Sequence, residues 1–255
     1  MKNTVEYNTT GFPIDIVPNI VHFVLFKVHE IEFAHFMSMV SLLRNHRPDL
    51  IYIHCDCTEL YGDNWHRVQA IANRTGTRLT VRPIEMPTQV FGKNLSEGWR
   101  LWHASDVTRI QVLREFGGIY LDRDVYVIKP FNEFFKYEMT IDFQSKNELG
   151  NQVLIAHKKA RFLRLYYESY REYDANAWYK NSGILPVLNI INKQPHLIHR
   201  MDGQFGVRPN VCHMLYTEGN ELSSIGWCLD DKKPPTCLGF IFGHHMSGPS
   251  DHHKT

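Results

Sequence analysis

Two aspartates stand two residues apart in the middle of the sequence, directly after an apolar run. Asp122 and Asp124 follow the segment IYL at residues 119–121. In an extended chain, side chains at i and i+2 point to the same side, so both carboxylates can reach one divalent cation. Carboxylate oxygens favour Mg²⁺ or Mn²⁺, and such an ion can bridge the phosphate oxygens of a ligand. A D-x-D tripeptide also arises by chance in about half of chains of this size, usually as a turn, so its context decides.

A second charged pair lies on the segment before these aspartates. Asp106 and Arg109 are three residues apart, which places them on one face of a helix. Gly117 and Gly118 end this helix and connect it to the apolar run, so the face that carries the pair can be directed at the cation. A carboxylate there suits sugar hydroxyls, and a guanidinium suits a diphosphate. The alternative is an ordinary salt bridge on a solvated helix surface.

The elements that must position these side chains follow from the apolar pattern. Continuous apolar runs of strand length alternate with segments whose apolar residues recur at helical spacing. The predicted strands are residues 20–26, 50–54, 79–82 and 119–121, and the predicted helices are residues 31–45, 65–73, 102–116 and 161–170. This alternation predicts an α/β fold in which helices flank a mostly parallel sheet. Ligands of such folds bind beyond the carboxyl ends of the strands, where the two aspartates lie.

Composition restricts the kinds of partner. The 255 residues carry 28 Lys+Arg against 27 Asp+Glu, a net charge of +1 that gives no electrostatic footprint for nucleic acid. The apolar runs are far shorter than the roughly 20 residues that span a bilayer, so no membrane span is predicted. Three sequons, at Asn8, Asn73 and Asn94, favour the Golgi or secretory lumen. No basic-then-apolar leader opens the chain, which keeps a cytoplasmic location open.

The cysteines predict little covalent cross-linking. Cys55 and Cys57 are two residues apart, which is too close for an ordinary bridge. Cys228 and Cys237 bracket a Pro-Pro turn and can pair, whereas Cys212 has no evident partner.

Longer stretches resemble one enzyme family. The segment ASDVTRIQVLREFGGIYLDRDVYVIKPF (residues 104–131) resembles the core motif of glycosyltransferase family 32, the group with a sugar-binding region containing a DXD motif. VPNIVHFVLF (17–26) resembles its first nucleotide-binding strand, AWYKNSGILPVL (177–188) a stretch of its animal branch, and GHHMSGPSD (243–251) its closing region. The resemblance implies a GT-A fold, a Mn²⁺ or Mg²⁺ cofactor and transfer with retention of configuration. It also implies a nucleotide-sugar donor, with a UDP-sugar favoured and GDP-mannose possible, and a glycan or glycolipid acceptor.

The resemblance assigns roles to individual residues. It matches Asp122 and Asp124 to the metal-binding pair, with Asp124 as the direct ligand. It matches Asp106 to the acid that contacts the sugar and Arg109 to the arginine that contacts the donor. Gly118, in the turn between them, is expected at the donor site as well.

Further residues complete the predicted site. Phe23, with Phe26 as the alternative, is expected to stack on the nucleobase. Asn151 and Gln152 are the candidates for a nucleophile below the sugar ring. If they are structural turn amides instead, the acceptor attacks from the front face and the departing phosphate acts as the base. His244 is predicted to be a third metal ligand, because a neutral imidazole suits Mn²⁺.

The expected organisation is an N-terminal arm at residues 1–16 and a single GT-A-like catalytic domain at residues 17–255. Within it, residues 17–130 form the nucleotide-sugar-binding lobe, and residues 131–255 form the acceptor lobe and the closing segment. The closing segment lacks the tryptophans of the family motif, so a non-catalytic sugar-nucleotide binder is an alternative. A D-x-D phosphohydrolase is a further alternative, which the mid-chain position of the motif and the lack of a later G-D-x-x-x-D disfavour.

Overall fold

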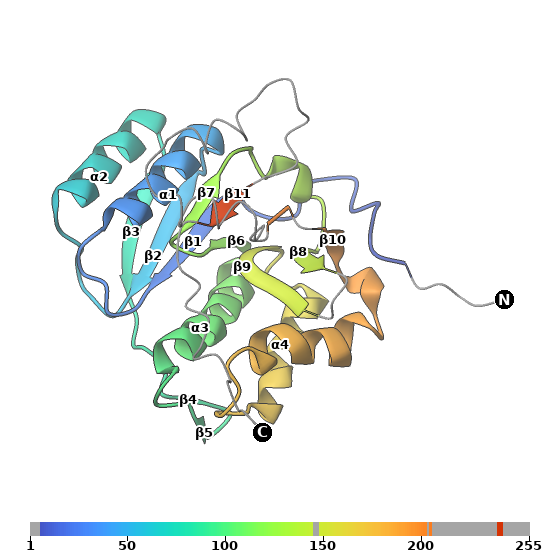
Figure 1. Cartoon of the computed structure of the whole chain (residues 1–255). Coiled ribbons are helices and arrows are strands. Elements are labelled where there is room, and N and C mark those ends of the chain that lie inside the picture. The colour runs from blue at the N-terminus through green and yellow to red at the C-terminus, as the bar shows by residue number, and fades with distance from the viewer. Residues whose placement is uncertain (1–5, 145–147, 203, 206–238, 242–255) are drawn as a thin grey trace, which may run out of the picture.

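A computed structural model describes residues 6–144, 148–202, 204–205 and 239–241 of the chain (Figure 1). The main strands are β1 (Ile20–Leu25), β2 (Leu50–Cys55), β3 (Arg78–Pro83), β6 (Gly118–Leu121), β8 (Met139–Gln144), β9 (Glu148–Ala156) and β10 (His199–Met201). Short strands are β4 (Gln89–Val90), β5 (Lys93–Asn94), β7 (Val125–Val127) and β11 (Gly239–Ile241). The α-helices are α1 (Phe33–Asn45), α2 (Asp63–Thr75), α3 (Arg100–Phe116) and α4 (Arg161–Ser169).

The main strands form one seven-stranded sheet in the order β10-β8-β9-β6-β1-β2-β3. Strand β1 pairs in parallel with β2 and β6, β2 with β3, and β8 with β10, whereas β9 runs antiparallel to both β6 and β8. The predicted strands and helices are all present, with ends shifted by at most two residues. The prediction of a mostly parallel α/β sheet is therefore confirmed. The sheet contains strands from both sides of residue 130, and the division into two lobes remains a prediction.

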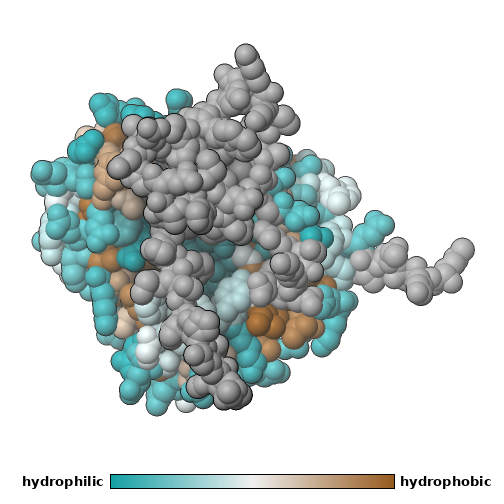
Figure 2. Space-filling model, viewed as in Figure 1, coloured by the Kyte–Doolittle hydropathy of each residue, from teal (hydrophilic) through white to brown (hydrophobic). Residues whose placement is uncertain are grey.

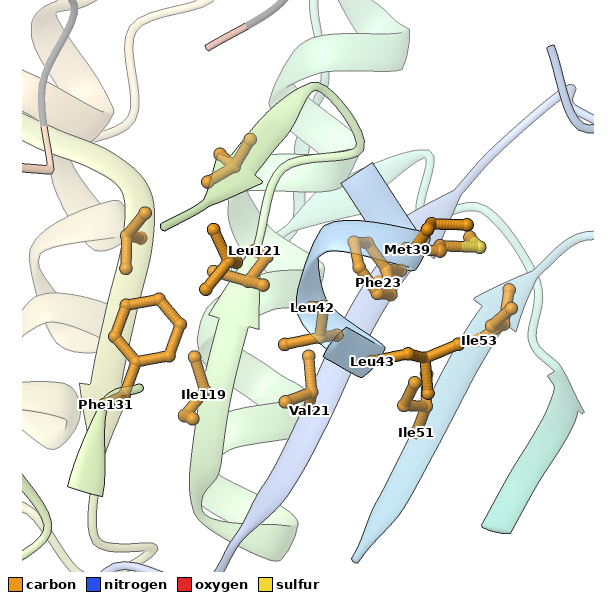
Figure 3. Close-up of a cluster of buried hydrophobic side chains, with 14 of the residues drawn as sticks. Val21, Phe23, Met39, Leu42, Leu43, Ile51, Ile53, Ile119, Leu121 and Phe131 are labelled. Atoms are coloured by element: carbon orange, nitrogen blue, oxygen red, sulfur yellow. The ribbon is translucent and has the colours of Figure 1, made fainter. Parts of the chain in front are cut away.

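The two faces of the sheet bury two separate apolar cores. Alternate residues of β1 enter different cores, because successive side chains of a strand point to opposite faces. Val21 and Phe23 pack with α1 residues such as Met39 and Leu42 (Figure 3). Val24 and Phe26 belong to the other core, which α3 and α4 cover. Most of the residues that Figure 2 colours are hydrophilic, with hydrophobic ones in separate patches between them.

The connection between α3 and β6 requires glycine. Gly117 ends α3, as predicted, and its N–H donates to the Leu113 carbonyl at 2.8 Å. Gly118 has a φ of 105°, and a Cβ atom there would lie 2.3 Å from the Ile20 carbonyl oxygen. Gly118 thus serves the close approach of β6 to β1. It is not among the residues that line the pocket described below, and its place at the donor site stays a prediction.

Backbone hydrogen bonds connect the first described residues to the segments that precede β8 and β10. The backbone N–H groups of Asn8, Phe12 and Ile16 donate to the carbonyls of Ile198, Lys136 and Phe135. None of the helices in the described part of the chain is long and apolar enough to cross a membrane.

Cys55 and Cys57 form a disulfide, which contradicts the prediction that they are too close to pair. Strand β2 ends at Cys55, and the chain bends through Asp56, so the Cys57 side chain turns back instead of continuing the strand. The other three cysteines lie outside the described residues.

Five histidines are buried in the described part of the chain: His22, His35, His46, His54 and His103. His22 on β1 and His54 on β2 approach each other with 3.0 Å between Nδ1 and Nε2, and His22 Nε2 lies 2.8 Å from the Gly117 carbonyl oxygen. Because that carbonyl can only accept, His22 Nε2 carries a proton and His54 Nε2 donates to His22 Nδ1. Burial lowers the pKa of His22, His35 and His46 to about 4 and that of His54 to about 3. These side chains therefore stay neutral in the folded protein at mildly acidic pH.

We expect acid to destabilise the fold through these histidines. Below the unfolded pKa of about 6.5 the unfolded chain binds protons that the folded chain excludes until about pH 4, so stability falls as the pH drops through this window. Each histidine should lower the free energy of unfolding by about 1 kcal/mol between pH 7 and about pH 5.5. His35→Leu, which removes one such group, should flatten the dependence of the melting temperature on pH. The exposed His66→Leu is the matched control, and equal slopes for both variants would contradict this account.

Candidate active site

A pocket of about 160 Å³ opens where the carboxyl ends of β1 and β6 meet α3. This volume is below the roughly 300–1,000 Å³ of typical small-molecule sites, so the pocket holds only part of a ligand as large as a nucleotide sugar. Its lining includes an uncommon concentration of polar side chains: Ser105, Asp106, Arg109, Asp122, Asp124, Asn151 and Gln152. The aspartates and the arginine predicted from their spacing are thus brought together.

Arg109 lies at the centre of this group. Its Nη2 is 3.1 Å from Asp106 Oδ1, its Nη1 is 3.3 Å from Asp122 Oδ1, and Nη1 also donates to the Asn151 carbonyl at 2.8 Å. The guanidinium carbon lies 4.5 Å from the centre of the Tyr120 ring, so the group is also held by a cation–π contact. Only 6% of the Arg109 side chain is exposed. The guanidinium therefore joins a carboxylate on α3 to one that follows β6, with its donors already engaged.

Two further hydrogen bonds orient the carboxylates. Asn151 Nδ2 donates to Asp106 Oδ1 at 2.9 Å, and the Tyr120 hydroxyl donates to Asp122 Oδ1 at 2.6 Å. The Asp106 side chain is 12% exposed and that of Asp122 is 29% exposed. Asp106 and Arg109 do form the salt bridge considered as the alternative, but within the pocket wall and not on a solvated surface.

The pocket concentrates negative charge that protein cations compensate only in part. Burial raises the pKa of the Asp106 carboxyl, although Arg109 and His103 act in the opposite direction. Burial, and then the neighbouring Asp122 charge, raise the pKa of Asp124 to about 7. Burial alone would lower the pKa of Arg109, but Asp122, Tyr120 and Asp106 raise it above its ordinary value, so the guanidinium stays charged.

The donor set fits a divalent cation. Asp122 and Asp124 both line the pocket, and their oxygens are the ligands that Mg²⁺ and Mn²⁺ prefer. Within the described residues, no three His, Cys, Asp or Glu side chains form a cluster that could hold a metal ion. Further ligands would have to be water, phosphate oxygens of a bound donor, or residues outside the described part, where His244 lies.

The structure corrects the expected stacking of Phe23 and leaves the nucleophile role of Asn151 and Gln152 a prediction. Phe23 is fully buried in the core beneath α1, so it cannot stack on a ligand in the pocket, whereas Phe26 lines it. Asn151 and Gln152 both line the pocket, but their amide groups are engaged. The Asn151 amide holds Asp106, and that of Gln152 donates to the Phe205 carbonyl.

Sequence reasoning missed several lining residues. Tyr120 could have been found, because it precedes Asp122 by two residues and so shares its side of the strand. Trp102 and Trp178 contact each other edge-on at 5.2 Å between ring centres, and both line the pocket. No local signal joins these two tryptophans, which lie 76 positions apart in the sequence.

Comparison with known proteins agrees with this geometry. Residues 35–146, which contain the Asp106, Arg109 and D-x-D set, match the family described as "Glycosyltransferase sugar-binding region containing DXD motif". Over these residues the chain is therefore similar to the DXD glycosyltransferases.

A curated relative and two solved structures extend the comparison. The chain is 27% identical over 189 residues to Glucan organizing enzyme 1 of Cryptococcus neoformans var. grubii serotype A, which covers 67% of this chain and 49% of the relative. The chain thus spans about half the length of this relative. It resembles the apo structure of the bifunctional glycosyltransferase WbbM with a TM-score of 0.50 and 9% identity, over 93% of this chain and 48% of that one. The galactosyltransferase LgtC, in complex with donor and acceptor sugar analogues, gives a TM-score of 0.49 and 13% identity over 90% and 87% of the two chains. The likeness to WbbM concerns the fold, and the expected GT-A type of α/β fold is confirmed.

Removing the central cation of this DXD region should destabilise the protein strongly. Arg109→Met leaves two carboxylates in the pocket without their partner, and loss of one partner of a buried pair costs about 3–5 kcal/mol. Urea denaturation should show this loss, and Asp106→Asn in the same background should restore part of it, because one uncompensated charge is removed.

Arg171→Met is the matched control, because Arg171 forms an exposed i,i+3 pair with Glu168. This change should cost less than about 1 kcal/mol. Similar losses in the two variants would contradict the view that Arg109 neutralises buried charge.

Proposed function

We propose that the protein is a metal-dependent, retaining glycosyltransferase. In this proposal it moves a hexose or N-acetylhexosamine from a nucleotide-sugar donor to a glycan or glycoconjugate acceptor. The observation that carries the proposal is the placement of Asp106, Asp122 and Asp124 in one pocket at the carboxyl end of β6. The DXD family match supports sugar transfer, and the donor, the metal and the stereochemistry are the parts proposed here.

The carboxylates have separate tasks in this proposal. Asp122 and Asp124 would hold Mn²⁺ or Mg²⁺, which when bound supplies Lewis-acid neutralisation of charge on the leaving diphosphate. Asn151 and Arg109 both contact Asp106 Oδ1. In this proposal the remaining lone pairs of the Asp106 carboxylate accept hydrogen bonds from the hydroxyls of the donor sugar. Arg109 fixes the geometry of both carboxylates instead of contacting the diphosphate directly, because its donors are engaged within the protein.

Apolar side chains suit the remaining parts of the substrates. Val24 and Phe26 offer an apolar wall at the end of β1, which we assign to the nucleoside of the donor. Trp102 is 42% exposed and lies with Trp178 in the pocket wall, so its ring can cover the apolar face of a sugar. A UDP-sugar is the favoured donor on the family resemblance, with GDP-mannose as the second choice.

Retention is assigned to front-face attack. Asn151 is 8% exposed and its amide N–H donates to Asp106, so we assign it to positioning that carboxylate and not to attack on the anomeric carbon. The acceptor oxygen forms its bond to the anomeric carbon on the side from which the phosphate oxygen departs. The hydroxyl proton passes to the departing phosphate oxygen, so no protein base is required.

Asp124→Asn should abolish most turnover while the protein stays folded. A neutral amide binds Mn²⁺ poorly, so we expect a loss on the order of 100-fold or more in nucleotide release from a UDP-sugar. The measurement is a coupled assay for the released nucleotide, over a panel of UDP-hexoses and GDP-mannose with and without Mn²⁺. The exposed Asp63→Asn, at the start of α2, is the control and should keep full activity.

A parallel thermal-shift screen separates catalysis from binding alone. A donor should raise the melting temperature of the wild type in the presence of Mn²⁺ and much less without it. Stabilisation without turnover would favour the non-catalytic binder instead. Normal turnover by Asp124→Asn, or activity that a chelator leaves untouched, would exclude the metal-dependent reaction.

We also propose that the protein matures in the secretory lumen. Asn73 and Asn94 are exposed, and a disulfide joins Cys55 and Cys57, as an oxidising compartment permits. Expression through a eukaryotic secretory pathway should therefore add mass that a glycan-cleaving enzyme removes. The double change Asn73→Gln/Asn94→Gln should abolish most of the added mass, and an unmodified wild type would count against this location.

A further inference from the structure

A second hollow in the surface lies between the end of α3 and the start of α4. The two helices lie side by side (Figure 1). The groove between them has a volume of about 500 Å³ and shares no lining residue with the pocket that holds the aspartates. Its walls come from residues 111–115 on one side and residues 158–167 on the other.

Four cations without acidic partners line this groove. Arg114 stands on the α3 wall, and Lys158, Lys159 and Arg164 stand on the α4 wall, all of them exposed. None of the four forms an ion pair with an acidic side chain of the described residues. The start of α4 adds the positive end of its helix dipole to the same region.

Two acidic residues near the groove, Glu115 and Glu138, already form ion pairs. Glu115, which also lines the groove, pairs with Arg82 at 3.7 Å, and Glu138 pairs with Arg161 at 2.9 Å. The groove therefore concentrates positive charge on a chain whose net charge is only +1. Like charges held this close repel one another, and a bound polyanion would relieve that repulsion.

We propose that this groove binds a sulfated glycan chain. Cations on both walls can contact anionic groups on both sides of a narrow chain, with Arg114 and Arg164 offering forked donors for tetrahedral oxyanions. A flat bilayer fits this concave shape poorly, because charges inside a groove stand back from a planar surface.

The aromatic rings beside the groove disfavour nucleic acid. Single strands bind by stacking bases on open aromatic faces. Here the guanidinium carbon of Arg114 lies 4.6 Å from the centre of the Tyr167 ring, and Phe91 packs against the same ring at 5.0 Å. The guanidinium carbon of Arg171 lies 4.2 Å from the centre of the Phe91 ring. With these faces occupied, recognition rests on charge, which suits the closely spaced sulfates of a glycan.

The test uses calorimetry to measure the binding of a size-defined heparin oligosaccharide to the full chain at several salt concentrations. With four cations engaged, the dissociation constant should rise on the order of 100-fold between 50 and 200 mM salt. The triple change Lys158→Gln/Lys159→Gln/Arg164→Gln should weaken binding by at least about tenfold and flatten the salt dependence. Arg44→Gln/Arg74→Gln/Lys193→Gln is the control, because it removes the same charge from exposed positions outside the groove.

Each outcome decides the matter. Loss of heparin binding in the groove variant alone, with its melting temperature unchanged, supports the proposal. Equal loss in the control variant, or no binding by the wild type at low salt, overturns it. Tighter groove-dependent binding to a single-stranded oligonucleotide or to vesicles rich in phosphatidylserine would also overturn it. Because the groove lies outside the pocket, a failure here leaves the transferase proposal unaffected, and the converse also holds.

Discussion

The buried guanidinium of Arg109 is the constraint on which the arrangement of the site depends. It contacts Asp106 on its own helix, Asp122 after β6 and the Asn151 carbonyl on β9, so three separate elements meet at one cation. A carboxylate as buried as that of Asp106 is tolerated only when it is paired and hydrogen-bonded. The short glycine connection between α3 and β6 serves this contact, because it brings the end of β6 back beside the helix that carries Arg109.

Most of the sheet could be predicted from the sequence, because each element that the pattern indicates is long or strongly periodic. The face of the sheet toward which each strand side chain points could not be predicted. Residues 20–26 are nearly all apolar, so the pattern does not show which of Phe23 and Phe26 faces α1 and which faces α3. The structure places Phe23 on the α1 side and Phe26 at the pocket. The antiparallel insertion of β9 beside β6 was equally hidden, because strand pairing depends on partners distant in the chain.

The site also has residues that the sequence could predict and contacts that it could not. Asp106, Arg109, Asp122 and Asp124 were accessible because helix and strand periodicity alone puts each pair on one side. The bond from Asn151 to Asp106 spans 45 residues and depends on how β9 docks, so spacing gave no hint that this amide would be occupied. The Cys55–Cys57 disulfide was missed for a local reason, because the expectation assumed an extended chain where β2 in fact ends.

The tryptophans at the pocket give the protein a built-in optical reporter. Trp99 and Trp102 both contact the Trp178 ring edge-on, with centres 5.8 and 5.2 Å away, so three of the five tryptophans of the chain form one cluster. Indole emission responds to polarity and to quenching by neighbouring groups. Trp102 is partly exposed where a ligand would enter, whereas Trp65 lies buried beside α1 and is insulated from that event. Occupation of the pocket can therefore be followed by the intrinsic fluorescence of the unlabelled chain.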